Sequence, residues 1–264
     1  MHAISSEDAV AVEVVRPEGT GRRVNYIGSP GIIDDNPQAF LVDRLYSGAR
    51  INPHFHDIDQ FQVVVDGYCT MGKRPAAPVS FQYADAYTPY GPIVGEEQGF
   101  AFFTLRPIAS GGFFAMPGNR KNMKCRAGRN IVGQFDTDRP RPEPGVVVHE
   151  VLMATQNDGA NAVGIRLGAG ALALGLESNA GGQYYLVCEG EVAQNGQHLP
   201  RRSVIHVAPG EAPPTFHAGE DGADVLLVQF ARPSERPGSD PQQLAARDPD
   251  AYMQRPEHGK LPRS

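Results

Sequence analysis

Short apolar runs separated by turn-forming residues make up most of this chain. Val, Ile, Phe and Tyr dominate the runs, and Gly, Pro and Asp stand between them. Short runs of β-branched and aromatic residues with such boundaries indicate β-strands. The clearest runs are 62–65, 100–105, 145–148, 184–187, 203–207 and 224–230. Long stretches with helical spacing are absent, so we predict an all-β fold. The best helix candidate, 241–249, predicts a short helical C-terminal tail.

Composition narrows the class of partner. The chain has 264 residues, 41% hydrophobic residues and a net charge of −6, and its Lys and Arg form no long basic run. Nucleic acid and acidic membrane surfaces are therefore not expected as partners. No apolar run approaches the roughly 18 residues of a membrane span. The first residues lack a basic start followed by an apolar stretch, and the three cysteines are far apart, so we expect a cytoplasmic protein.

Two histidines one residue apart are the clearest candidate for chemistry. His54 and His56 lie in an apparently extended run, and side chains two apart in a strand share a face. Two imidazoles on one face can begin a metal site. Gln60 follows four residues later and offers an amide oxygen. Asp57 and Asp59 fall on the other face by strand parity, so we expect them at the surface or in a turn.

The spacing of these residues resembles the first motif of the cupin family, Gly-x5-His-x-His-x3-Glu-x6-Gly. Gly48, His54, His56 and Gly67 fall in register, and Gln60 stands where the family usually has Glu. The resemblance implies a small β-barrel with a divalent transition metal such as Fe, Mn, Ni or Zn at its mouth. His54, His56 and Gln60 would then be the ligands. The alternative is a histidine pair that forms hydrogen bonds in a pocket without metal.

An internal repeat predicts a second barrel. Gln183 precedes Gly190 by the same spacing that separates Gln60 from Gly67, at an offset of 123 residues. Two strand-like runs also end in Arg-Pro, at an offset of 126. We therefore predict two tandem cupin barrels: residues 20–117 for the first, a linker at 118–142, residues 143–233 for a degenerate second barrel, and a tail at 234–264.

The second motif of the family, Gly-x5-Pro-x-Gly-x2-His-x3-Asn, is incomplete in both halves. In the first half its histidine position falls on Val94. In the second half His217 stands three residues late, and a short insertion would place it correctly. The second-barrel counterpart of the site would then comprise Glu177, Asn179, Gln183 and His217. One histidine and one carboxylate make a poor transition-metal site, so a purely structural second barrel is the alternative.

Aromatic, amide and arginine side chains are expected around the first site. Tyr87 and Tyr90 follow the second-motif loop and are the candidate catalytic groups. Tyr46 and Gln62 would line an apolar cleft with a few polar groups. Arg50 and Arg106 would clamp a substrate carboxylate, because a guanidinium matches it with two hydrogen bonds; the alternative for each is a surface ion pair.

Three functions remain open from the sequence. The first is a metal-dependent cupin enzyme acting on a small organic molecule, with a carboxylate as one option and dioxygenase-type oxidation as the first guess. The second is a non-catalytic cupin that binds a small molecule without metal. The third is a metal-independent isomerase or epimerase with His54 or His56 as general base. Family resemblance also implies a homodimer.

Overall fold

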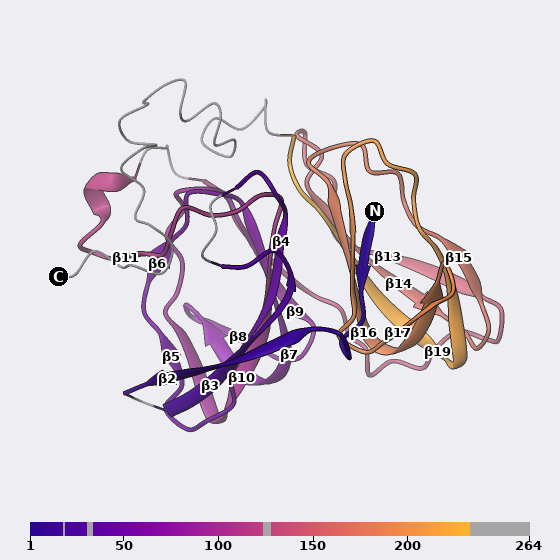
Figure 1. Ribbon diagram of the computed structural model, residues 1–264, viewed down its shortest axis with the longest axis horizontal. Helices are drawn as coiled ribbons and strands as arrows, with labels where there is room; N and C mark the ends of the chain where they lie inside the picture. Colours follow the sequence, from indigo (N-terminus) through magenta and orange to yellow (C-terminus); the bar gives the residue numbers. More distant parts are fainter. Residues whose placement is uncertain (18, 31–33, 124–127, 233–264) are drawn as a thin grey trace. The chain divides into compact units, whose positions relative to one another are not determined.

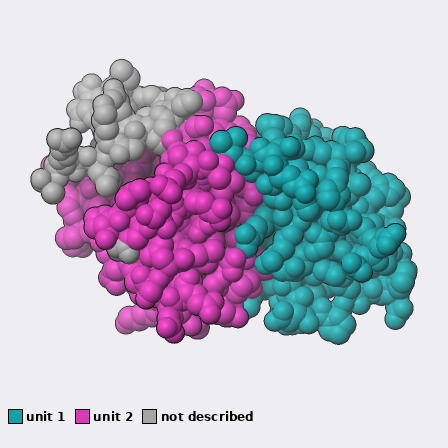
Figure 2. Space-filling model, turned by 60° about the horizontal axis from the view of Figure 1, so that its bottom comes forward, with its two compact units in different colours: residues 1–10, 133–232 teal, residues 11–132, 233–264 magenta. Residues whose placement is uncertain are grey.

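A computed structural model describes residues 1–17, 19–30, 34–123 and 128–232 (Figure 1). Almost all of its regular structure is β-strand, which confirms the all-β prediction, and the only helical element in these ranges is the 3-10 turn η1 (Arg120–Asn122). The predicted helix at 241–249 lies outside the described residues. Two compact units form, residues 11–132 and residues 133–232 with 1–10 (Figure 2). The antiparallel strands of each unit form a jelly-roll barrel. We call them barrel one and barrel two.

Barrel one is built on a nine-stranded antiparallel sheet. The strands along it run in the order β12-β9-β7-β10-β4-β3-β2, and β5 and β8 pair with β10 and β7. A separate two-stranded sheet joins β6 and β11. The strands are β2 (Val10–Arg16), β3 (Gly19–Ile27), β4 (Gln38–Arg44), β5 (Arg50–Ile51), β6 (His54–Phe55), β7 (Gln60–Met71), β8 (Arg74–Ala76), β9 (Ser80–Ala84), β10 (Ile93–Arg106), β11 (Phe114–Ala115) and β12 (Asn130–Gln134).

Barrel two repeats this plan with eight strands. Their order is β1-β18-β16-β19-β14-β13, and β15 and β17 pair with β19 and β16. The first strand of the chain, β1, pairs with β18 and so belongs to this barrel. The strands are β1 (His2–Ile4), β13 (Val147–Met153), β14 (Asn161–Leu167), β15 (Leu172–Leu174), β16 (Gln183–Gln194), β17 (Gln197–Pro200), β18 (Val204–Val207) and β19 (Thr215–Gln229). No helix in the described part of the chain is long and apolar enough to cross a membrane.

The register of the central strands shows that the two barrels correspond at a constant offset of 123 residues. The counterparts at one end of each barrel are Gln60 and Gln183, Arg106 and Gln229, Gln38 and Asn161, and Ala84 and Val207. The repeat found in the sequence is therefore structural. The two Arg-Pro pairs are not equivalent, however, because Gln229, and not Arg232, occupies the position of Arg106.

The inward-facing rows of side chains differ between the barrels. In barrel one, two successive rows are polar and buried; their polar members are Gln38, Gln60 and Arg106, then Gln62, Gln82 and Thr104. In barrel two, only the first row is polar, and the second belongs to the apolar core; its members are Val163, Tyr185, Ile205 and Leu227. Barrel one thus has a deeper polar interior than the fold requires.

Glycines in the left-handed region mark the corners that both barrels share. Gly99 and Gly222 are counterparts, with φ of +74° and +73°. A Cβ atom on Gly99 would lie 2.1 Å from the backbone oxygen of Arg44, and one on Gly222 would lie 2.3 Å from that of Leu167. Both the φ value and the close approach of a neighbouring strand require glycine at these corners.

Replacing Gly99 by alanine should therefore destabilise the protein by more than about 2 kcal/mol, because left-handed strain adds to a clash with backbone. Gly118 is the matched control, since a Cβ atom there meets nothing within 4 Å; Gly118→Ala should stay within about 0.5 kcal/mol of wild type. Urea unfolding measures both. Equal stabilities for the two variants would contradict this explanation of the corner.

Candidate functional site

The His54–His56 segment bends rather than continuing as one strand. β6 ends at Phe55, a bend follows at Asp57 and Ile58, and β7 begins at Gln60. The two imidazole rings nevertheless converge, with centroids 5.2 Å apart and planes at 88°. Both side chains are buried. The predicted pair therefore forms, although it does so through the bend and not through strand parity.

Arg106 lies at the centre of the site, at the end of β10. Its Nε donates to Oε1 of Gln60 at 3.3 Å, and its Nη1 donates to Oε1 of Gln38 at 3.1 Å. Its Nη2 lies 3.3 Å from both ring nitrogens of His56. The guanidinium also lies over the ring of Phe40, 5.3 Å from the centroid. A buried positive charge is thus held by amide, imidazole and aromatic groups of barrel one.

Backbone carbonyls determine which nitrogen of each imidazole carries hydrogen. Nδ1 of His54 lies 2.8 Å from the oxygen of Asn52, and Nδ1 of His56 lies 2.5 Å from that of Gly112. A carbonyl oxygen can only accept, so Nδ1 is the donor in both rings. Nε2 of each neutral ring is therefore an acceptor, and Nε2 of His56 accepts from Arg106.

Asp57 holds the loop that follows β10 against this segment. Its Oδ1 accepts from Oγ of Ser110 at 2.8 Å and from the backbone nitrogen of Gly111 at 2.9 Å. The next residues of the loop are Gly112, which fixes His56, and Phe113, whose ring stacks on His54 at 4.0 Å. Asp57 therefore positions both histidines through the loop.

Burial and the guanidinium keep both histidines neutral. Desolvation lowers the pKa of His54 to about 4, and the positive charges of Arg106 and Arg44 add to the effect. Desolvation and Arg106 also lower the pKa of His56 well below its usual value. Burial raises the pKa of Tyr90, so its hydroxyl stays protonated. Arg106 is therefore a positive charge among neutral imidazoles and a protonated phenol.

These residues do not fit a divalent metal as they are arranged. Two of the three predicted ligand atoms, Oε1 of Gln60 and Nε2 of His56, accept hydrogen bonds from Arg106. Two unit charges 4 Å apart repel by about 4 kcal/mol at an effective dielectric near 20, and a divalent ion doubles that repulsion. Among the residues that the structure describes, no three His, Cys, Asp or Glu side chains cluster as metal ligands do.

Comparison with known proteins supports the fold. No family model matches the chain, and no curated protein matches it. Among solved structures, a putative dioxygenase from Nostoc punctiforme aligns with a TM-score of 0.59 at 11% identity, over 88% of this chain and 82% of that chain. Vicilin from hazelnut, Corylus avellana, aligns with a TM-score of 0.53 at 16% identity, over 87% and 85%. A mutant of Bacillus subtilis oxalate decarboxylase aligns with a TM-score of 0.53 at 14% identity, over 88% and 77%.

The chain has the tandem cupin fold. Identities of 11 to 16% show the fold alone. The three names also differ in kind, so the fold does not select a function. Function has to be argued from the residues inside the cupin barrels.

The structure brings some predicted site residues together and leaves others outside the cluster. Tyr90 joins it, because its hydroxyl accepts a hydrogen bond from Gln60 and its ring lies 4.5 Å from that of His54. Gln62 lies in the second polar row of the cupin interior. Tyr87 packs its ring on Phe55, at 5.9 Å, in a separate apolar cluster.

Two further predicted substrate-binding residues also lie outside the cluster. Arg50 is exposed, and its Nε donates to Oδ1 of Asn52 at 3.0 Å. The ring of Tyr46 is half-buried and packs over Gly19, where a Cβ atom would lie 2.7 Å from it.

Asp57 and Asp59 were expected at the surface or in a turn; Asp57 does lie in the bend, but the expectation of a surface position is wrong. Each is 1% exposed. Asp59 accepts from the hydroxyl of Tyr83 at 2.9 Å and from the backbone nitrogen of Ala86 at 2.7 Å. The bend after β6 turns both carboxylates inward, and a strand-parity argument does not anticipate that bend. The sequence alone also did not identify Gln38 as a site residue. The one feature that points to it is its position opposite Arg106 in the strand register.

The proposed second-barrel set comes together only in part: Gln183 and Asn179 both form hydrogen bonds with Gln229, whereas the side chains of Glu177 and His217 do not join them. Gln183 is buried, whereas Glu177, Asn179 and His217 are exposed, and Glu177 contributes only its backbone oxygen to Gln183. His217 is the counterpart of Val94 at the offset of 123. In each strand the preceding residue, Phe216 or Ile93, is the one that points into the core.

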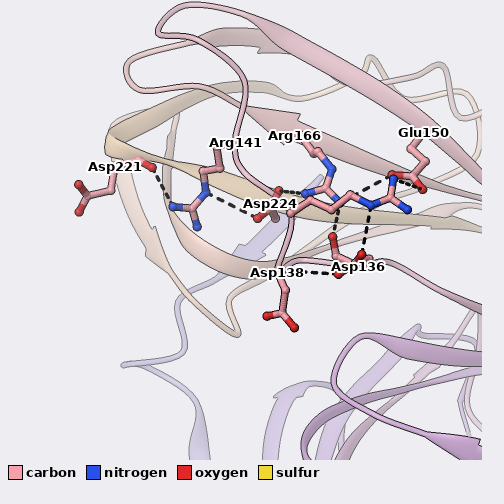
Figure 3. Close-up of polar contacts among 8 residues, drawn as sticks. Asp136, Asp138, Arg141, Glu150, Arg166, Asp221 and Asp224 are labelled. Atoms are coloured by element: carbon pink, nitrogen blue, oxygen red, sulfur yellow. Dashed lines mark hydrogen bonds and ion pairs between the residues drawn. The ribbon is translucent and has the colours of Figure 1, made fainter.

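A second polar cluster lies on barrel two (Figure 3). Arg166 pairs with the buried Asp224 at 3.5 Å and donates to the backbone oxygen of Asp136. Arg141 lies 3.6 Å from Asp224 and donates to the oxygen of Asp221 at 2.8 Å (Figure 3). A groove of about 520 Å³ adjoins it, lined by Thr137, Asp138, Arg139, Arg141, Glu189 and Asp221. These contacts fasten the segment before β13 to the sheet.

Acid should destabilise the wild-type protein more than a His54→Phe variant. The folded-state pKa of His54, about 4, lies below its usual 6.5, so the unfolded chain binds a proton first as pH falls. Stability is therefore lost between about pH 6.5 and 4, in total by roughly 3 kcal/mol, and is unaffected above that window. Urea unfolding at pH 7.5, 6 and 5 measures the difference. Parallel losses in both proteins would rule out this role for His54.

Proposed function

We propose that barrel one binds a small organic carboxylate at Arg106 without a resident transition metal. One observation carries the proposal: a charged residue occupies a buried position that barrel two fills with a neutral one. Burying an ion costs several kcal/mol unless opposite charge and hydrogen bonds compensate it. An anionic ligand at this position adds opposite charge to the hydrogen bonds that Gln60, Gln38 and His56 already provide.

The hydrogen bonds of barrel two support the proposal, because they reproduce the network without charge. Oε1 of Gln229 accepts from Nε2 of Gln183 at 2.9 Å, and Nε2 of Gln229 lies 3.1 Å from Oδ1 of Asn179. Gln183 and Asn179 are the counterparts of Gln60 and His56. The fold therefore closes this end of a barrel with three amides, and the guanidinium of Arg106 is an addition to it.

The depth of the polar interior also supports a binding site. The second row in barrel one is polar where the matching row in barrel two is apolar. Ligand pockets generally combine an apolar wall with a few oriented polar groups. Phe40 packs against Arg106, and Phe113 and Tyr90 pack against His54, so aromatic rings adjoin the polar groups of this cluster.

General-base catalysis is less well supported than binding. A base works best when its pKa is near the working pH, and the pKa of His54 is about 4. A metal-independent isomerase would therefore begin with a weak base. Binding of an anion without turnover is the better match.

The metal-dependent reaction, with dioxygenase-type oxidation first, is the second candidate. One observation favours it: each histidine directs Nδ1 at a backbone carbonyl, as metal-binding histidines usually do. It requires the guanidinium of Arg106 to leave His56 and Gln60.

Replacing Arg106 by glutamine, the residue at the equivalent position of barrel two, tests the leading proposal. Arg106→Gln should weaken binding of small carboxylates, measured by calorimetry across a panel of mono- and dicarboxylic acids, by at least about tenfold. The reason is that a hydrogen bond to a charged group contributes roughly 1.5–3 kcal/mol. Arg74→Gln removes an exposed charge from the same barrel and should change nothing. Unchanged affinity in Arg106→Gln, or no binding by wild type, would refute the proposal.

Metal affinity separates the two candidates. If Arg106 excludes cations, Arg106→Gln should bind Ni²⁺ or Zn²⁺ at least about tenfold more tightly than wild type in tag-free protein. Elemental analysis and competition with a chelator measure this affinity. Stoichiometric metal in wild-type protein, lost in His54→Phe, would favour the metal-dependent candidate instead.

A further inference from the structure

The groove on barrel two is lined almost entirely by charged side chains of both signs. Five of its six lining residues are charged, and they are Asp138, Arg139, Arg141, Glu189 and Asp221. Its volume of about 520 Å³ is in the range of small-molecule sites, roughly 300–1,000 Å³. With three carboxylates and two guanidiniums, the lining carries a net charge of −1. A matching ligand therefore carries charges of both signs, with one positive charge in excess.

Arg141 is held by three groups and keeps one nitrogen for a ligand. Its Cδ is 3.0 Å from where a Cβ atom on Gly222 would lie, so the corner glycine makes room for the side chain. Its Nε lies 3.6 Å from Oδ2 of the buried Asp224, and its Nη1 donates to the backbone oxygen of Asp221 at 2.8 Å. Its Nη2 has no acceptor among the residues that the structure describes. The counterpart of Asp224 in barrel one is Ala101, so the fold itself does not require this charge.

Asp221 places a carboxylate beside Arg141 without pairing with it. The backbone oxygen and the carboxylate of one aspartate are about 3–5 Å apart by covalent geometry, so this carboxylate lies close to the guanidinium. In the described part of the chain it forms no ion pair with Arg141 or with any other residue. Figure 3 shows it directed away from the guanidinium. The groove thus presents two opposite charges side by side, which is the complement of an ammonium and a carboxylate on one carbon.

Asp138 supplies a second carboxylate to the same groove. Only its backbone nitrogen is engaged, by Oδ1 of Asp136 at 3.2 Å, and its side chain has no partner within the described ranges. Figure 3 shows this side chain directed away from the neighbouring ion pairs. The other charged groups of the lining are already paired, Arg139 with Asp136 at 3.1 Å and Glu189 with Arg201 at 3.1 Å. Asp138 is therefore the group that can meet the excess positive charge of a ligand.

We propose that this groove binds a basic α-amino acid such as lysine or ornithine. Its α-carboxylate binds Arg141, its α-ammonium binds Asp221, and its side-chain ammonium binds Asp138. The site belongs to barrel two, so this inference does not rest on the carboxylate binding proposed for barrel one. All three protein groups are exposed or half-buried, so each pair contributes modestly and the affinity falls as salt is added.

Lysine analogues that each lack one charge test the inference on the full-length, tag-free protein at low salt. Norleucine lacks the side-chain ammonium, cadaverine lacks the carboxylate, and 6-aminohexanoate lacks the α-ammonium. Calorimetry or NMR titration should show that lysine binds about fivefold or more tightly than each analogue, as expected when an exposed ion pair is lost. Equal binding of lysine and any one of the analogues would overturn the proposal, as would absence of lysine binding.

Two conservative variants locate the ligand in the groove. Asp221→Asn should remove the advantage of lysine over 6-aminohexanoate, and Asp138→Asn should remove its advantage over norleucine. Both residues are exposed, so both variants should fold. Glu220→Gln removes an exposed carboxylate that does not line the groove, and this variant should bind lysine as wild type does. Preferences that persist unchanged in Asp221→Asn and Asp138→Asn would place lysine elsewhere on the chain and overturn the proposal.

Discussion

A guanidinium can be buried in a β-barrel only if acceptors surround it, and the arrangement of barrel one follows from this requirement. Arg106 takes the side-chain oxygens of Gln60 and Gln38 and a ring nitrogen of His56. That nitrogen accepts only because Gly112 holds the hydrogen on the opposite side of the ring. Gly112 is in place because the Asp57 carboxylate fastens the preceding loop residues. One charge therefore explains the orientation of a strand end, a bend and a loop that are distant in sequence.

The duplicated fold separates what the architecture needs from what was added to it. At the same register, barrel two joins Gln183, Gln229 and Asn179 by hydrogen bonds between neutral amides. Behind them lies an apolar core, where barrel one places a second polar row. Jelly-roll closure thus needs a hydrogen-bonded end layer but no cation, no imidazole and no second polar row. The cation, the imidazoles and the second polar row are present in barrel one and absent from barrel two. A functional explanation therefore has to account for these groups first.

Much of the fold could be predicted from the sequence, because local patterns carry it. Apolar runs between Gly, Pro and Asp indicate strands, and the spacing of Gln60 to Gly67 recurs at Gln183 to Gly190. The site was predictable only in part. His54 and His56 follow from their spacing, but the inward turn of Asp57 depends on a bend, and the pairing of Gln38 with Arg106 depends on a register between distant strands. Counting along the family motif places its histidine at Val94. In the strand, however, the side chain that points into the core is that of the preceding residue, Ile93. Counting along the chain does not reveal the twist and bulges that decide such orientations.

A fixed organic cation and a metal ion select ligands in different ways from the same corner of a cupin barrel. A metal offers open coordination positions and tolerates neutral or anionic oxygen. A guanidinium offers hydrogen atoms in one plane, and its partners determine which of them point inward. Gln60 and Gln38 accept from Nε and Nη1, and Nη2 lies on the side where the two histidines stand, 3.3 Å from both ring nitrogens of His56. Their neutral state makes that side an acceptor surface next to a positive charge.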